Sequence, residues 1–200
     1  FRQYVQDMHD LIEFCRGDET TTWGKVRVSL GHPEPFELKY ICIGNEQEGE
    51  VYFERYQVFL DSFNEAKAKN PELYEGLELI YSSGTDDATS GAQYLPSYEY
   101  AYNYIKDNNI SINDFAGATD HHYYNEPSWF LKNADHYDEK NYSRDADGML
   151  DTRYGGGIKV FVGEYAARSN RLEAALAEAA YMTGLERNGD IVEMAAYAPL

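Results

Sequence analysis

Apolar residues along the chain follow two spacings in turn, and together they predict alternating helices and strands. Near the N-terminus, apolar side chains three or four positions apart predict a helix over residues 1–16. Residues 18–37 are polar and rich in turn-forming residues, and a short apolar run at 38–43 predicts the first strand. Aromatic residues at helical spacing then predict a second helix over 51–69.

The same alternation continues to the C-terminus. Further strands are predicted at 77–81, 115–124 and 158–163, with helices at 97–107 and 171–186. A short helical piece is predicted at 128–134 inside a long loop, and another helix is predicted to begin at 191. Strands that recur with a helix between them are typical of βαβ units, so the sequence predicts an α/β fold with a parallel sheet.

The number of strands leaves two architectures open. A closed (β/α)₈ barrel takes about 250 residues, whereas this chain has 200 residues and four predicted strands. The chain is therefore either a four-stranded open sheet or about half of a barrel. A half-barrel exposes two strand edges and an apolar face. It would need contact with the missing part of the barrel or with a second copy of itself.

Charge and hydropathy exclude two classes of partner. The net charge is −18, from 35 acidic and 17 basic residues, which disfavours nucleic acid because phosphates need a basic surface. No apolar run approaches the roughly 20 residues of a membrane span, so no membrane contact is expected. The first residues already resemble the middle of a helix, which suggests that the chain begins inside a longer protein.

The two cysteines say little about location. Cys15 and Cys42 form no metal or redox motif and are predicted to be two separate buried thiols. The compartment stays open, with a secreted or periplasmic location favoured over a cytoplasmic one.

Two glutamates each follow an apolar strand. Glu46 follows Gly44 and Asn45 at the end of the strand at 38–43, and Glu164 follows Gly163 at the end of the strand at 158–163. Catalytic residues of barrel enzymes lie at these C-terminal strand ends, and glycoside hydrolysis needs two carboxylates. Either motif alone is weak, because a loop glutamate that faces water would look the same.

The strand at 115–124 also ends in polar and aromatic residues. His122 and Tyr124 are two positions apart, so both point to one side of the strand, while His121 and Tyr123 point to the other side and are expected to be structural. Trp129 lies on the following loop, above the expected pocket, and could stack on a sugar. The alternative is that Trp129 is a core residue.

Five motifs occur in the chain in a fixed order. They are Gly31–Pro35 (GHPEP), Tyr40–Glu46 (YICIGNE), Asp120–Tyr124 (DHHYY), Glu126–Phe130 (EPSWF) and Val160–Ala166 (VFVGEYA). Together they resemble the family 51 glycoside hydrolases, which are chiefly α-L-arabinofuranosidases. The resemblance covers residues 4–200, essentially the whole chain.

The resemblance implies a (β/α)₈ barrel, a separate β-sandwich domain, and hydrolysis with retention of anomeric configuration. It implies that Glu46 is the acid/base after the fourth barrel strand and that Glu164 is the nucleophile after the seventh. It also implies that Asn45 bonds the sugar 2-hydroxyl, that His122 lines the sugar pocket and that Tyr124 holds the nucleophile's carboxylate. The substrate would be an arabinofuranoside-containing polysaccharide or oligosaccharide, and neither a cofactor nor a metal is implied.

By this resemblance, residues 1–200 would be part of a (β/α)₈ catalytic domain, about strands four to seven with flanking helices. The family's first three strands, its last strand and its β-sandwich have no counterpart in the sequence. A glutamate and an asparagine on the early strands are likewise missing. Two alternatives stay open: a related barrel hydrolase that acts on β-glucan or β-xyloside, and a catalytically incomplete fragment that only binds carbohydrate.

Overall fold

One parallel sheet organises the molecule. The computed structural model describes residues 1–85, 94–139, 141–144, 146 and 157–198. Five strands form the sheet, hydrogen-bonded in the order in which they occur along the chain. They are β1 (Tyr40–Ile43), β2 (Glu78–Thr85), β3 (Ala118–Asn125), β4 (Lys159–Ala167) and β5 (Val192–Tyr197). The α/β fold with a parallel sheet is confirmed.

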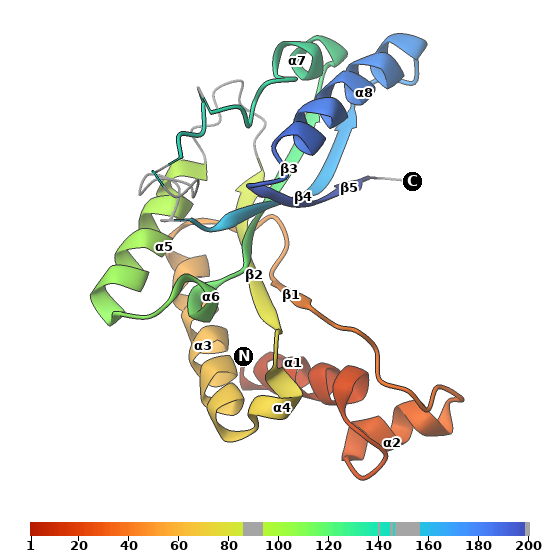
Figure 1. The fold of residues 1–200 in the computed structure, drawn as a ribbon, viewed down its shortest axis with the longest axis vertical. Coiled ribbons are helices and arrows are strands. Elements are labelled where there is room, and N and C mark those ends of the chain that lie inside the picture. Colours follow the sequence, from red (N-terminus) through yellow and green to blue (C-terminus); the bar gives the residue numbers. More distant parts are fainter. Residues whose placement is uncertain (86–93, 140, 145, 147–156, 199–200) are drawn as a thin grey trace.

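Helices precede and connect the strands. Before β1 come α1 (Arg2–Arg16) and α2 (Thr22–Ser29). The connections contain α3 (Gly49–Lys69), α4 (Pro71–Tyr74), α5 (Tyr94–Asn108), α6 (Ile112–Phe115), α7 (Pro127–Lys132) and α8 (Leu172–Arg187). Figure 1 shows α3, α5 and α6 beside the first strands of the sheet, and α8 beside β4 and β5. No helix among the described residues is long and apolar enough to cross a lipid bilayer.

The core fills the space between the sheet and these helices. Ile43 of β1, Tyr56 of α3 and Phe115 of α6 belong to one buried cluster. Val162 of β4 and Tyr181 of α8 belong to a second. Because side chains alternate along a strand, the opposite face of the sheet is free to present polar groups.

The sheet curls toward a barrel. In a flat sheet, the two outermost of five strands would lie about 19 Å apart. Here the hydroxyl of Tyr40, on β1, donates to Oε1 of Glu193, on β5, at 3.0 Å. Lys159 of β4 donates to Oε2 of the same carboxylate at 2.6 Å. Polar side chains thus meet across the concave face near the N-terminal ends of the strands, and the fold is part of a (β/α)₈ barrel.

The strand count was wrong by one. The segment predicted to begin a helix at 191 forms β5, which pairs with β4 in parallel. A strand therefore follows the one that carries Glu164, where the last barrel strand was expected to be missing. The residues of β5 (VEMAAY) include good helix formers, but the open edge of β4 offers backbone partners, and tertiary pairing outweighs the weak local preference.

Two smaller expectations also fail. Residues 18–37 contain helix α2, which begins where the Thr21 side chain accepts a hydrogen bond from the Gly24 amide. The two cysteines are separate and free, as predicted, but neither is buried: Cys15 is half-buried and Cys42 is exposed. Cys42 lies between Ile41 and Ile43 on β1, so it points away from the core that these two residues enter.

Candidate active site

A tight turn after β1 positions Glu46. Gly44 and Glu46 both have positive φ angles, 90° and 52°, and Glu46 is a residue type that rarely adopts this conformation. The turn is fastened to β2, because the amide of Gln47 donates to Oγ of Ser82 at 2.9 Å. A strained residue held in this way is common at functional sites.

A β-bulge in β4 positions Glu164. In the register between β3 and β4, His121 pairs with Val162, but His122 pairs with Glu164, so Gly163 is an extra residue. Val162 is fully buried in the helix-facing core. Regular alternation would place Glu164 on that same face, and the bulge instead turns its carboxylate to the concave face.

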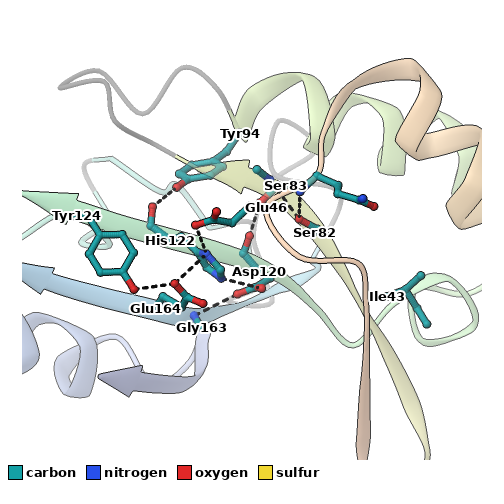
Figure 2. A network of polar contacts seen from close by, with 12 residues as sticks. Ile43, Glu46, Ser82, Ser83, Tyr94, Asp120, His122, Tyr124, Gly163 and Glu164 are labelled. Atoms are coloured by element: carbon teal, nitrogen blue, oxygen red, sulfur yellow. Dashed lines mark hydrogen bonds and ion pairs between the residues drawn. The ribbon is translucent and has the colours of Figure 1, made fainter. Parts of the chain in front are cut away.

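His122 lies between the two glutamates. Its Nδ1 is 3.1 Å from Oε1 of Glu46 and 3.5 Å from Oε2 of Glu164. Its Nε2 is 3.0 Å from Oδ2 of Asp120. Figure 2 shows the imidazole surrounded by these three carboxylates, with the loop after β1 above it and β4 below. The two predicted catalytic candidates are therefore brought together, although they are far apart in the sequence.

The carboxylates set the charge of His122. Burial by itself would lower the pKa of His122, but the hydrogen bonds to Asp120 and Glu46 and the charge of Glu164 outweigh it and raise the pKa to about 9. At neutral pH the ring is therefore an imidazolium, and Nδ1–H donates to Glu46. A positively charged ring thus lies beside both glutamates.

Tyr124 completes the surroundings of Glu164. Its hydroxyl donates to Oε2 of Glu164 at 2.6 Å, as expected for a residue that orients this carboxylate. Burial, reinforced by the hydrogen bond to Glu164, raises the pKa of Tyr124 well above its ordinary value. The tyrosine therefore stays protonated and remains a donor.

The separation of the carboxylates indicates the chemistry. One oxygen of Glu46, one oxygen of Glu164 and a ring nitrogen of His122 all lie within 4.8 Å of one another. In the part of the chain that the structure describes, this is the one group of three acidic, histidine or cysteine side chains close enough to hold a metal ion. Retaining glycosidases place their carboxyl groups about 5–5.5 Å apart, and inverting enzymes about 6.5–9.5 Å apart. The short separation fits a retaining pair.

The remaining predicted site residues have different fates. Asn45 is exposed on the turn beside Glu46, and its contact with a sugar stays a prediction. Trp129 lies in α7 and is only 6% exposed. It packs on the helix side of the sheet with Tyr123 and Tyr181. Trp129 is therefore a core residue, which was the alternative interpretation. Tyr123 points away from the concave face, and the indole packs against it in the apolar cluster.

Asp120 is a site residue that the sequence interpretation missed. It is 6% exposed, and its side chain contacts both His122 and the backbone of β4. A signal for it was present, since Asp120, His122 and Tyr124 are each two positions apart and must share one face of the strand.

Comparisons with known proteins identify the family of the chain. The family model described as "Alpha-L-arabinofuranosidase 1 domain" matches residues 1–144, and that described as "Alpha-L-arabinofuranosidase C-terminal domain" matches 154–200. The chain belongs to the family 51 α-L-arabinofuranosidases. In the structure, the second matched segment supplies β4, α8 and β5, which continue the same sheet.

Individual members of the family resemble the whole chain. An extracellular exo-α-L-arabinofuranosidase of Streptomyces chartreusis is 39% identical over 199 residues, which are 100% of this chain and 20% of that protein. α-L-Arabinofuranosidase 1 of Arabidopsis thaliana is 36% identical over 98% of this chain and 24% of its own length. The structure of an arabinose-bound family 51 α-L-arabinofuranosidase superposes with a TM-score of 0.65 at 30% identity, covering 99% of this chain and 28% of that one. The chain thus spans about a fifth to a quarter of the curated relatives it matches.

Proposed function

We propose that this chain provides the catalytic carboxylates of a retaining α-L-arabinofuranosidase. The observation that carries the proposal is the convergence of Glu46 and Glu164 on His122. One oxygen of each carboxylate and a ring nitrogen of His122 lie within 4.8 Å of one another. That spacing leaves no room for the water that an inverting enzyme places between sugar and base. Family membership indicates which sugar is hydrolysed, since relatives of this chain are named for arabinofuranoside hydrolysis.

The reaction takes two displacements. Glu46 begins as the carboxylic acid and gives its proton to the glycosidic oxygen while a carboxylate oxygen of Glu164 attacks the anomeric carbon, so the bond to the leaving group breaks as the glycosyl–enzyme ester forms. Glu46, now a carboxylate, then removes a proton from water, which attacks the same carbon and releases arabinose and free Glu164. Two inversions give net retention.

Neighbouring residues prepare the nucleophile and hold the sugar. Tyr124 donates to Oε2 of Glu164, which leaves Oε1 free to attack and fixes the plane of the carboxylate. We assign Asn45 to the sugar 2-hydroxyl, because it lies exposed on the turn that carries Glu46. His122 lines the pocket from below, and its bond to Glu46 must yield when the leaving-group oxygen arrives.

The test uses the full-length protein and an aryl α-L-arabinofuranoside. Glu164→Ala should abolish turnover, and Glu46→Ala should lose turnover but recover it with added azide, which needs no general base. The matched control is Glu54→Ala, since Glu54 is exposed on α3. Wild-type turnover by Glu164→Ala would refute the assignment. Faster wild-type hydrolysis of an aryl β-xyloside or β-glucoside would refute the choice of sugar.

We also propose that the rest of the barrel covers the open edges of this sheet and that the protein is exported. The free edges of β1 and β5 would pair with the rest of the barrel, and a second copy of the chain is the competing partner. The Streptomyces relative is named as extracellular, and we extend export to this protein. Solution mass separates a monomer from a dimer, and activity in the culture fluid tests export.

A further inference from the structure

Asp120 connects the two strands that carry the site. It lies on the concave face of β3, and its two carboxylate oxygens have different partners. Oδ2 is 3.0 Å from Nε2 of His122, and Oδ1 accepts the amide hydrogen of Gly163 at 3.1 Å. Its backbone carbonyl accepts a hydrogen bond from the buried Ser83 hydroxyl at 2.6 Å, which fixes this part of β3 to β2.

The contact with His122 decides how the imidazole points. A carboxylate at Nε2 requires a proton there, and it turns Nδ1 toward Glu46 and Glu164. The negative charge of Asp120 also favours the doubly protonated ring. Without Asp120, a neutral ring could carry its single proton on either nitrogen, and Nδ1–H would no longer be secured for Glu46.

The contact with Gly163 decides how Glu164 points. Gly163 is the extra residue of the bulge that turns Glu164 to the concave face. A Cβ atom built on Gly163 would lie 2.1 Å from Oδ1 of Asp120, so carboxylate and glycine fit each other closely. The hydrogen bond thus stabilises the bulged backbone immediately before the nucleophile.

We propose that Asp120 is a positioning residue of the reaction: it holds His122 toward both glutamates and fixes the bulge that aims Glu164. This role rests on the proposed function, since it has kinetic meaning only if Glu46 and Glu164 perform the chemistry. Within the described residues, Asp120 hydrogen-bonds neither glutamate, and it acts through His122 and Gly163.

Asp120→Asn in the full-length protein is the first variant. Asparagine keeps an oxygen that can accept from Gly163 but removes the charge beside His122. We expect kcat on an aryl α-L-arabinofuranoside to fall roughly 10- to 100-fold, as for loss of a charge-assisted hydrogen bond, with KM changed less than about threefold. Asp107→Asn, an exposed position on α5, is the matched control and should leave kcat unchanged.

A second measurement does not depend on turnover. In protein with ¹³C-labelled histidine, the His122 Cε1 signal, assigned by its loss in His122→Phe, should titrate near the pKa of about 9. Asp120→Asn should lower that midpoint by at least about one pH unit, whereas Asp120→Glu, which keeps the charge, should lower it less. If wild-type protein fails to hydrolyse the arabinofuranoside, the proposed function fails, but the titration still tests Asp120.

A double-mutant cycle tests whether Asp120 acts through His122. If it does, Asp120→Asn should cost clearly less in a His122→Phe background than in wild type. Unchanged kcat and an unchanged His122 midpoint in Asp120→Asn would overturn the proposal. Loss of folding in both Asp120→Asn and Asp120→Glu, seen by thermal unfolding, would also overturn it and make the residue purely structural.

Discussion

His122 and Glu164 face each other across β3 and β4, with Nδ1 and Oε2 3.5 Å apart, although regular alternation along the two strands would place them on opposite faces. The bulge at Gly163 reverses the alternation of β4 at this one point. The same bulge returns Tyr165 to the helix-facing core, where it is buried. One inserted residue thus serves both the site and the packing behind it.

The bulge predicts a strong effect of Gly163→Ala. The new methyl group would lie 2.1 Å from Oδ1 of Asp120, so either the bulge or Asp120 must move. We expect a destabilisation of about 1–3 kcal/mol, typical of overpacking, and a loss of kcat larger than stability explains. Thermal unfolding and steady-state kinetics of the full-length protein measure both.

Gly189→Ala is the control for this variant. A Cβ atom at Gly189 would meet only the Glu186 carbonyl oxygen, at an ordinary contact distance of 3.6 Å. Equal effects of the two substitutions on kcat would show that the bulge does not aim the nucleophile.

The hydrogen bond from Tyr124 to Glu164 predicts the effect of Tyr124→Phe. Removal of the hydroxyl takes away a charge-assisted bond of 2.6 Å, which is worth about 1.5–3 kcal/mol. We expect kcat to fall roughly 10- to 100-fold while the fold is kept, because the ring remains. Steady-state kinetics with an aryl arabinofuranoside decide this, and a kcat within twofold of wild type would show that Tyr124 does not orient the nucleophile.

The anchor of the Glu46 turn predicts a milder effect of Ser82→Ala. The change removes the acceptor of the Gln47 amide and frees a turn in which Glu46 holds a positive φ angle. We expect kcat/KM to fall roughly three- to tenfold, the scale of one ordinary hydrogen bond. The control is Ser29→Ala, whose exposed hydroxyl bonds only its own helix, and a loss of the same size there would contradict the anchor.

Much of the site could be predicted from the sequence. Glu46 follows β1, and His122, Tyr124 and Glu164 lie in the C-terminal halves of β3 and β4. The carboxyl ends of parallel strands meet at one edge of the sheet, so their convergence follows from topology. The same-face positions of His122 and Tyr124 follow from the two-residue period of a strand. These inferences need only the pattern of apolar and polar residues and the order of the strands.

The rest depends on contacts that the sequence does not display. A bulge is invisible in the pattern around Gly163, because any glycine in a strand could equally mark a turn or a close approach. The role of Asp120 can be inferred only when the position of the Gly163 amide is known. Strand β5 carries residues that favour a helix, and only the free edge of β4 decides otherwise. The burial of Trp129 depends likewise on α8, which covers it.

One buried and one half-buried histidine, His121 and His136, predict instability in acid. Burial lowers the pKa of His121 well below its usual value and lowers that of His136 to about 4. Tyrosine hydroxyls contact both rings, and neighbouring His136 and His122 lower the pKa of His121 further, whereas Asp135 raises the pKa of His136. The folded state keeps both rings neutral while the unfolded chain takes up protons below about pH 6.5. The contribution of the two neutral rings to the free energy of unfolding is therefore complete above about pH 6.5 and is lost as the pH falls toward 4.

Denaturant unfolding at pH 7.5 and pH 5 measures this effect. We expect the fall in stability to be smaller in His136→Phe than in wild type, and unchanged in His32→Gln, since His32 is exposed. The same fall in His136→Phe as in wild type would contradict the assignment.

Trapping of the glycosyl–enzyme tests the central claim most directly. The Glu46→Ala variant of the full-length protein is given an aryl α-L-arabinofuranoside with a good leaving group. Glu164 of this variant can still attack the substrate, but the base for the second step is missing. Mass spectrometry of the digested protein should find one added pentosyl group on the peptide that contains Glu164, and none in the Glu46→Ala/Glu164→Ala double variant. A pentosyl group on another residue, or product formed with inversion and no adduct, would contradict the account.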